Sequence, residues 1–223
     1  MAVIHRTTMQ PTKAELIADW LPSRAWYTAG PEAPRPVRAG GFRLDDPAGE
    51  VGIEFMAVTD GEGPDAVTYL VPMTYRGKPL DGAESALIGT SEHGVLGTRW
   101  IYDGTHDPVL VGQVYELLAG RAVPQQQSVS DAVDPTVTAT LGAPAPEGDA
   151  AVPDATDGPE GTDVRIEVPG GTPLTLRFHR TLRPAADEDR DGTGVLGRVT
   201  AEWTPAGAEG ATARGAYITV RGA

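Results

Sequence analysis

Alternating apolar and polar residues predict an antiparallel hairpin in the first half of the chain. Apolar positions recur at every second residue at Val51, Ile53, Phe55 and Ala57. This period of two is typical of a strand. The turn-forming run DGEGPD follows at 60–65, and the alternation resumes over 67–75, which completes the hairpin. Because Pro72 cannot donate to a sheet ladder, we expect its strand to lie at an edge or to be bulged there. A third strand is predicted over 98–102.

A helical pattern precedes this hairpin. Thr12 followed by Glu15 forms a T-x-x-E capping box, in which each side chain satisfies a backbone N–H of the first turn. An apolar stripe follows at Leu16, Ile17, Trp20 and Leu21. Pro22 ends the helix. We therefore predict a helix that packs one face on a core.

A second helix is predicted after the third strand. Asp107 can cap its N-terminus, Pro108 suits the first helical position, and Gly120 suits the exit. Its apolar positions recur at helical spacing at Leu110, Val114, Leu117 and Leu118. This pattern favours one buried face.

The remainder of the chain divides by composition. Residues 125–162 are dominated by Ala, Pro, Gly, Ser, Gln and acids, which bury too little apolar surface to offset their ordering entropy. We expect a flexible acidic segment over 121–162, with a short strand at 137–141. Alternation then predicts strands at 164–168, 174–178, 195–203 and 216–220. Because four short strands make a thin core, we expect residues 163–223 to complete the sheet of residues 1–120 in an α+β fold.

The net charge of the chain disfavours two classes of binding partner. Its 31 acidic residues against 18 Lys and Arg give a formal net charge of −13, which disfavours nucleic acid and anionic membrane surfaces. No apolar run approaches the ~18 residues of a spanning helix, and the N-terminus lacks the apolar core of a secretory signal. The absence of cysteine excludes disulfides and thiolate chemistry. We therefore expect a cytoplasmic protein.

The motifs of phosphoryl transfer are missing from the sequence. A P-loop requires G-x-x-x-x-G-K-[ST], and neither Lys13 nor Lys78 lies in such a run. The H-x-D-x-x-x-x-N catalytic loop of protein-kinase-like enzymes is also absent. The sequence establishes no enzymatic activity, and we expect no cofactor and no phosphoryl transfer by this chain alone.

Three groups of polar residues resemble parts of metal or catalytic sites. The D-x-D-x-D-G run at 187–192 matches the start of an EF-hand loop. Arg198 stands where the bidentate Glu is due, which favours an acidic hairpin tip and no metal. Ser91 and His93 lack the G-x-S-x-G elbow of a nucleophile, and Glu92 and His93 are interpreted as residues that hold a turn. The pair Asp45-Asp46 could serve glycoside hydrolysis, but its position before a proline is typical of a turn.

Aromatic side chains are the usual platforms for sugars, because the C–H faces of a sugar stack on apolar rings. The candidates are Trp26, Tyr27, Trp100, Tyr102 and Tyr115. With 6% aromatic residues in the chain, most of these are expected in the core.

Several blocks of sequence carry a resemblance to a known family. They are LIGTSEHGVLGTRWIYDGTHDPVL at 87–110, the opening run HRTTMQPTKAELIADWLPSRAWY, DDPAGEVGIEFMAV and VPMTYRGKPLDGAE. In this order they resemble the N-terminal cap of actinobacterial maltokinases and related aminosugar kinases, over residues 1–120. The resemblance implies a cystatin-like α+β cap with a curved antiparallel sheet. It also implies a role in modulating a kinase whose catalytic residues lie in a later lobe.

The resemblance therefore implies a non-catalytic, cap-like interaction or regulatory module linked to maltose, trehalose or glycogen metabolism. Its partner would be a sugar kinase or a glucan-metabolising enzyme. Three alternatives stay open. The first is a module that binds a small sugar or glucan through Trp100, Tyr102 or Trp26. The second is a subunit needed in trans for ATP-dependent sugar kinase activity. The third is a hydrolase with paired acids.

One structured loop region is expected to form the interaction surface. Its residues are Glu92, His93, Arg99, Trp100, Tyr102, Asp103 and Asp107. Arg99 could pair with Glu92 or Asp103, and an exposed pair contributes ~0–1 kcal/mol to stability. The alternative interpretation is that these residues stabilise turns and strand ends.

Overall fold

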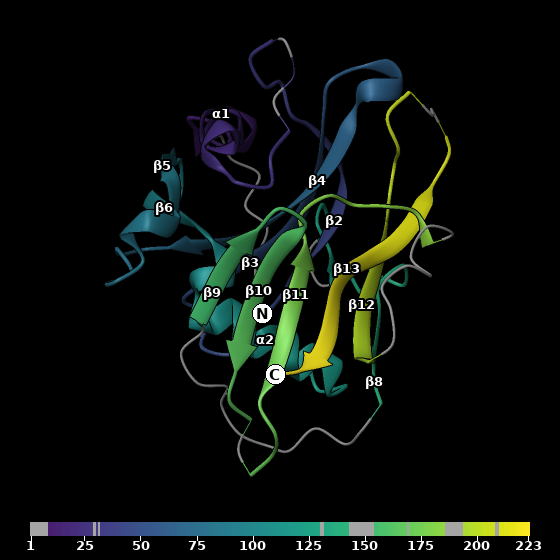
Figure 1. The fold of residues 1–223 in the computed structure, drawn as a ribbon. Coiled ribbons are helices and arrows are strands. Elements are labelled where there is room, and N and C mark those ends of the chain that lie inside the picture. Colours follow the sequence, from purple (N-terminus) through teal and green to yellow (C-terminus); the bar gives the residue numbers. More distant parts are fainter. Residues whose placement is uncertain are drawn as a thin grey trace.

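The computed structural model describes residues 9–28, 30, 32–129, 132–142, 154–168, 170–185, 194–207 and 210–223. Figure 1 shows a mostly antiparallel structure with two short α-helices, α1 (Lys13–Trp20) and α2 (Pro108–Leu118). The strands are β1 (Met9–Gln10), β2 (Val37–Leu44), β3 (Gly52–Asp60), β4 (Val67–Arg76), β5 (Leu87–His93), β6 (Gly97–Asp103), β7 (Gln125–Gln126), β8 (Thr138–Leu141), β9 (Asp154–Gly158), β10 (Gly161–Ile166), β11 (Leu174–His179), β12 (Val195–Trp203) and β13 (Ala213–Gly222). This architecture agrees with the predicted α+β class. Among the described residues, neither helix is long and apolar enough to cross a membrane.

The strands form one sheet that returns on itself. Their order is β1-β5-β6-β4-β3-β2-β12-β13-β11-β10-β9, with β7 paired to β2 and β8 paired to β12. After β11 the chain comes back to β4. The Leu70 amide donates to the Arg180 carbonyl at 2.9 Å, and the Leu182 amide donates to the Thr68 carbonyl at 2.8 Å. These bonds connect the path β4-β3-β2-β12-β13-β11 into a ring.

The central hairpin of β3 and β4 is buried on both faces. Directly opposite residues share a face of a sheet, and Phe55 lies opposite Pro72 while Met56 lies opposite Val71. One face packs with α2 and the C-terminal strands through Ile53, Phe55, Ala57 and Leu70. The other face packs under α1 through Met56, Val58, Tyr69, Val71 and Met73. The alternation predicted the two strands and their turn, whereas burial of the second face results from the helix above it.

The expectation that Pro72 lies in an edge strand or at a bulge is wrong. Pro72 lies where the segment paired with one side of β4 changes. Strand β4 lies between β3 and β6, and its register with β3 runs unbroken over 52–60. Main-chain amides two residues apart point to the same side of a strand. The Leu70 amide points away from β3 toward Arg180, and pairing with β6 begins at Met73. Pro72 therefore lies where β4 stops bonding to the segment at Arg180 and before it starts pairing with β6. Its missing N–H breaks neither set of hydrogen bonds.

Both predicted helices begin and end as their capping residues indicate. The Thr12 and Glu15 capping box is present, and Asp107 accepts a hydrogen bond from the Val109 amide at the start of α2. The Gly120 amide donates to the Leu117 carbonyl with a backbone φ of 73°, a conformation that favours glycine. The predicted apolar faces of both helices are buried.

The described parts of the segment 121–162, which was expected to be flexible, contribute strands. Strand β7 pairs with β2, β8 pairs with β12 and β9 pairs with β10. Main-chain hydrogen bonds to neighbouring strands order these pieces despite their few apolar side chains. Strand β8 agrees with the strand predicted at 137–141, and β10 to β13 occur where alternation predicts them. The acidic run at 187–192 lies outside the described residues.

A buried ion pair joins the chain after β11 to the end of β6. Arg180 has 0% of its surface exposed, and its Nη2 donates to Asp103 Oδ2 at 2.5 Å. Its Nε donates to Thr162 Oγ1 at 2.7 Å, and its guanidinium lies 4.8 Å from the ring centre of Trp26. Asp103 also accepts hydrogen bonds from the amide and hydroxyl of Thr105. The pair therefore connects four separate segments inside the molecule.

Replacing Asp103 with Asn should destabilise the protein strongly, because it leaves the Arg180 charge buried without a counter-charge. We expect the free energy of unfolding in urea to fall by about 3–5 kcal/mol. The matched control is Glu167→Gln, which removes the exposed partner of Arg165 and should cost at most ~1 kcal/mol.

The double variant Asp103→Asn/Arg180→Met tests the coupling. It should lose less stability than the sum of the two single variants, because each substitution relieves the unpaired group that the other one creates. Strictly additive losses would show that the two side chains do not stabilise each other.

Candidate functional site

A polar cleft of about 880 Å³ lies at the start of α1. Its walls come from α1, from β2 to β4, from the turns at 46–51 and 77–79, and from the β5–β6 hairpin. The ionisable residues in its lining are Lys13, Arg43, Asp46, Glu50, Glu54, Tyr75, Arg76, Lys78, His93 and Arg99. Gln127 completes the polar lining.

Strand register explains how residues distant in sequence share this cleft. Arg43 of β2 lies opposite Glu54 of β3, which lies opposite Met73 of β4. Met73 packs under α1, so Arg43 and Glu54 face α1 as well. Tyr75 is two residues beyond Met73 and shares its face. Tyr75 lies opposite Ile101, which places Arg99, two residues before Ile101, on the same side.

Glu54 is the centre of a hydrogen-bonded network on the floor of the cleft. Its carboxylate accepts from Lys13 Nζ at 2.6 Å, from Tyr75 Oη at 2.5 Å and from Gln127 Nε2 at 3.0 Å. Its side chain is 6% exposed, whereas that of Lys13 is 34% exposed. A buried carboxylate is stable when it is paired and fully hydrogen-bonded, and this network meets both conditions.

The network sets the charge state of its members. Burial opposes ionisation of Glu54, but the Lys13 charge and the hydrogen bonds from Lys13 and Tyr75 outweigh it and lower the Glu54 pKa. Burial and the adjacent Glu54 carboxylate raise the pKa of Tyr75 well above its ordinary value. At neutral pH the floor therefore holds the Glu54 carboxylate beside a neutral Tyr75 phenol.

Two glycines make room for this network. A Cβ on Gly41, whose φ is 121°, would lie 1.9 Å from the Phe55 carbonyl oxygen and 2.9 Å from Gln127 Nε2. A Cβ on Gly52 would lie 3.3 Å from the Tyr75 side chain. Only a residue without a side chain fits at position 41, because the backbone oxygen cannot move away as a flexible side chain could.

The structure divides the predicted interaction surface between the cleft and the interior. His93 and Arg99 line the cleft. Asp103 and Asp107 are buried, Asp103 with Arg180 and Asp107 with Arg76 through bonds of 2.6 and 2.7 Å. Asp107 also caps α2, so its role in the structure includes the helix entry that the sequence predicts.

The three remaining residues of that surface lie on the β5–β6 hairpin. Glu92 accepts from the Thr98 hydroxyl at 2.6 Å. Tyr102 is buried, and its hydroxyl accepts from the Leu80 amide at 2.9 Å. Trp100 is half-buried and packs beside Tyr102. Whether this hairpin binds a partner stays a prediction.

The expected ion pairs of Arg99 are wrong for the part of the chain that the structure describes. Its Nη2 donates to the Leu96 carbonyl at 2.7 Å. Arg99 lies opposite Ser91 in the register, so the neighbouring Glu92 points to the other face. Asp103 lies four residues along β6 and is held by Arg180. The sequence placed these residues near one another, but the strand period turns Glu92 to the other face, and the length of β6 separates Arg99 from Asp103 on the same face.

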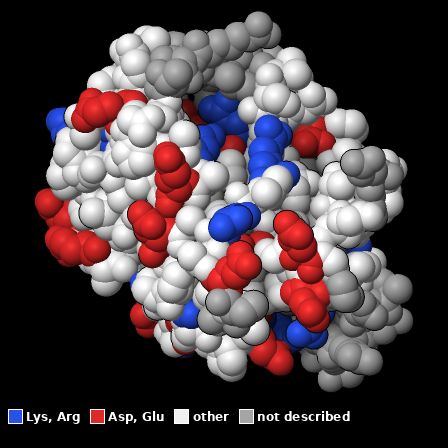
Figure 2. Space-filling model, turned by 90° about the horizontal axis from the view of Figure 1, so that it is seen from above, with Lys and Arg blue, Asp and Glu red and all other residues white. Residues whose placement is uncertain are grey.

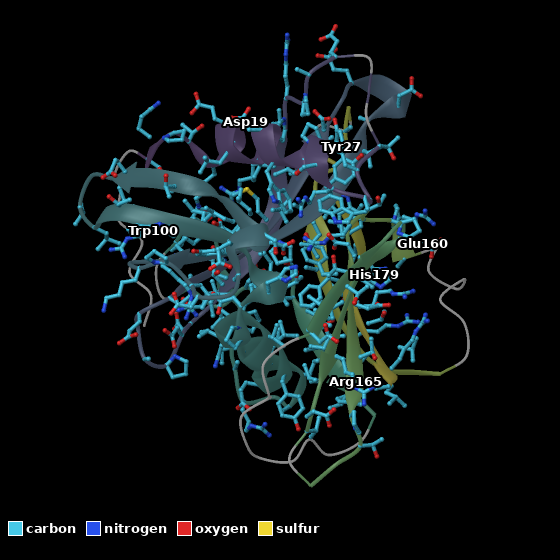
Figure 3. All side chains as sticks on the ribbon, turned by 60° about the vertical axis from the view of Figure 1, so that its left-hand side comes forward. Asp19, Tyr27, Trp100, Glu160, Arg165 and His179 are labelled. Carbon is cyan, nitrogen blue, oxygen red and sulfur yellow. The ribbon has the colours of Figure 1, made fainter. Side chains whose placement is uncertain are left out.

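Burial also limits the other candidate residues. Trp26, Tyr102 and Tyr115 are each at most 3% exposed, so they are not surface platforms for a sugar. Figure 3 places Trp100 on the β5–β6 hairpin, on the opposite side of the molecule from Glu160. Asp46 is buried and accepts from the amides of its own turn, while Asp45 accepts from Gln125.

Ser91 and His93 do not form a nucleophile and base. The Ser91 hydroxyl donates to the Pro11 carbonyl at 2.7 Å. His93 Nδ1 accepts from the Val95 and Leu96 amides at 3.3 and 3.1 Å, in agreement with its interpretation as a turn residue. Within the described ranges, no group of three His, Asp or Glu residues is placed to hold a metal.

Sequence reasoning missed the Glu54 network. A signal was present, because Glu54 stands between Ile53 and Phe55 in an apolar strand, and a carboxylate in such a position needs a buried partner. The identity of that partner was not in the local pattern. Lys13 lies 41 residues earlier and Gln127 lies 73 residues later.

Comparison with known families bears out the resemblance, over a narrower range of the chain. Residues 20–107 match the model of the maltokinase N-terminal cap domain. The match begins at the end of α1 and ends at Asp107, so it is narrower than the expected range of 1–120. It includes β2 to β6 and hence most of the cleft. A search of curated proteins finds no match for this chain.

The Glu54→Gln variant should lose stability in a pH-dependent way. Because the folded-state pKa of Glu54 is below its ordinary value of 4.5, its stabilisation is complete above that value and disappears as pH falls through the folded pKa. The difference in unfolding free energy between wild type and variant should therefore be largest at neutral pH and shrink below about pH 4. The control Glu50→Gln changes an exposed carboxylate at the cleft and should show little difference. A Glu54→Gln deficit that is equal at neutral and acid pH would contradict the ion pair.

Proposed function

We propose that this chain is a cap-like interaction module of carbohydrate metabolism, which regulates a partner enzyme and does not itself catalyse a reaction. The observation that carries the proposal is the match of residues 20–107 to the maltokinase N-terminal cap domain in a sequence without the P-loop or catalytic-loop motifs of a kinase. The cystatin-like shape implied by the resemblance is part of this proposal. So is a cytoplasmic location.

The β5–β6 hairpin supports an interaction role. It lies within the matched segment, and Figure 1 shows it extending to one side of the molecule below α1. Val95 and Leu96 at its turn are 62% and 45% exposed. Apolar side chains on a projecting hairpin offer surface that a partner can remove from water. We therefore assign partner binding to this hairpin.

The partner that fits the match is a sugar kinase or a glucan-metabolising enzyme of the maltose, trehalose or glycogen pathways. Binding to a kinase could have two consequences. The chain could regulate a kinase that is active without it, or it could be a subunit that the kinase requires for activity. A reconstituted kinase assay with and without the chain separates them, because a required subunit abolishes activity when it is left out.

Direct sugar binding is the second candidate function. Trp100 and Tyr27 are the two candidate aromatic residues that keep part of their surface exposed. Tyr27 donates to Asp60 at 2.8 Å, which leaves Trp100 as the better platform. Maltose, glucosamine or a glucan should then change the tryptophan fluorescence of wild type and not that of Trp100→Leu. An unchanged spectrum and melting temperature with all three sugars would reject this candidate.

Affinity purification of the tagged protein from its own host should recover a sugar kinase or glucan enzyme in near-stoichiometric amounts. Val95→Asp should reduce that recovery about tenfold or more, because it puts a charge into an apolar contact. The matched control is Val133→Asp, since Val133 is 60% exposed and lies outside the matched segment. Equal loss in both variants would argue against the hairpin as the interface. ATP-dependent phosphorylation of a sugar by the pure chain would overturn the non-catalytic proposal.

A further inference from the structure

The lining of the cleft has the opposite charge balance from the chain as a whole. The chain carries a net charge of −13, and Figure 2 shows acidic side chains spread over one face of the molecule with basic ones between them. The cleft lining instead contains five basic residues, Lys13, Arg43, Arg76, Lys78 and Arg99. Its acidic residues are Asp46, Glu50 and Glu54. A concave site with an excess of one sign of charge concentrates ions of the other sign.

Protein groups neutralise two of these five cations. Lys13 is paired with Glu54, and Arg76 forms a two-bond pair with Asp107. Asp46 gives its carboxylate oxygens to three amides of its own turn. These partners belong to the structure of the site. The charge of Arg43 also lowers the Glu54 pKa, whereas Lys78 and Arg99 form no ion pair within the described ranges.

Those three side chains are available to a ligand. Within the described ranges, the side chains of Arg43 and Lys78 make no hydrogen bond or ion pair. Arg99 donates through Nη2 to the Leu96 carbonyl, but its Nε is buried and has no hydrogen-bond partner. A buried donor without a partner costs free energy, and an anion in the cleft would remove that cost.

The backbone holds Arg99 and Lys78 at the same end of the cleft. A Cβ on Gly77 would lie 2.7 Å from Arg99 Nη1, so the guanidinium passes directly over the residue before Lys78. Arg43 lies three strands away, on β2, about 14 Å from β6 at the usual strand spacing. One end of the cleft therefore presents a guanidinium and an ammonium group, and a second guanidinium stands at the other end.

We infer that this cleft binds a small phosphorylated ligand, with its phosphate group at Arg99 and Lys78. A planar guanidinium and an ammonium group match the oxygens of a phosphate dianion. A volume of about 880 Å³ is large enough for an organic body beside the phosphate. Lys13, Tyr75 and Gln127 offer that body polar contacts, and Arg43 attracts the anion from the far end. This inference does not require a partner enzyme.

Calorimetric titration of the full chain with glucose 6-phosphate tests the inference, with glucose and citrate as comparison ligands. Glucose 6-phosphate should bind, glucose should bind much more weakly, and raising the salt concentration should weaken the phosphate ester. Each of Arg99→Gln and Lys78→Gln should lower the affinity about tenfold, the loss expected for a charge-assisted hydrogen bond. Lys78 is exposed, so its variant should fold like wild type even if Arg99→Gln does not.

The matched control is Arg183→Gln, which removes one exposed cation outside the cleft and should leave the affinity unchanged. Equal losses in Arg183→Gln and Lys78→Gln would overturn the site, since they would indicate an effect of net charge. Equal binding of citrate and glucose 6-phosphate would overturn the assignment to phosphate. Absence of binding at millimolar concentrations of the ester would overturn the inference altogether. Binding without any partner in the affinity purification would support this site while rejecting the proposed function.

Discussion

Arg180 brings a guanidinium group into the interior, where Asp103 supplies the opposite charge and Thr162 accepts a further hydrogen bond. An isolated charge at that depth would be strongly unfavourable, so the position of Arg180 requires that β6, the turn after it, β10 and the chain after β11 all come together. Trp26 covers the guanidinium from the side of α1. The carbonyl of Arg180 also accepts a hydrogen bond from Leu70 of β4, and this bond helps to complete the ring of strands. Much of the remaining architecture depends on this contact.

The ion pair also defines how the matched segment relates to the rest of the chain. Asp103 lies within residues 20–107, and Arg180 lies well beyond them. Phe55 and Leu70 of the matched segment share a core with Val164, Phe178 and Ile218 of the C-terminal strands. The cap-like segment in this protein therefore does not bury its own apolar surface alone. Later strands cover the face of the central hairpin that α1 leaves open.

The cleft follows from the same division of faces. Because α2 and the C-terminal strands cover one face of β3 and β4, and α1 covers part of the other, the sheet beyond the start of α1 forms the floor of the cleft at Glu54 and Tyr75. Lys13 reaches Glu54 from the first residue of α1. The polar floor of the cleft thus results from the position where α1 begins, and that position is set by the capping box of Thr12 and Glu15. A local signal in the sequence therefore locates the site, although its contents come from several strands.

Local patterns in the sequence predicted many of the elements of this protein, although not β2 or β5. Alternation predicted the β3–β4 hairpin and β10 to β13, and the capping residues predicted both helices. These signals could be interpreted from the sequence because they depend only on residues that are close together along the chain. The resemblance in residues 87–110 indicated the family that the comparison then matched. The tertiary structure decided which face of each strand is buried and which segments pair with β4 on either side of Pro72. It also decided which carboxylates pair with Arg180 and Arg76. It also assembled Lys13, Glu54, Tyr75 and Gln127, because charges and hydrogen bonds act across short distances in space between residues that the chain order keeps far apart.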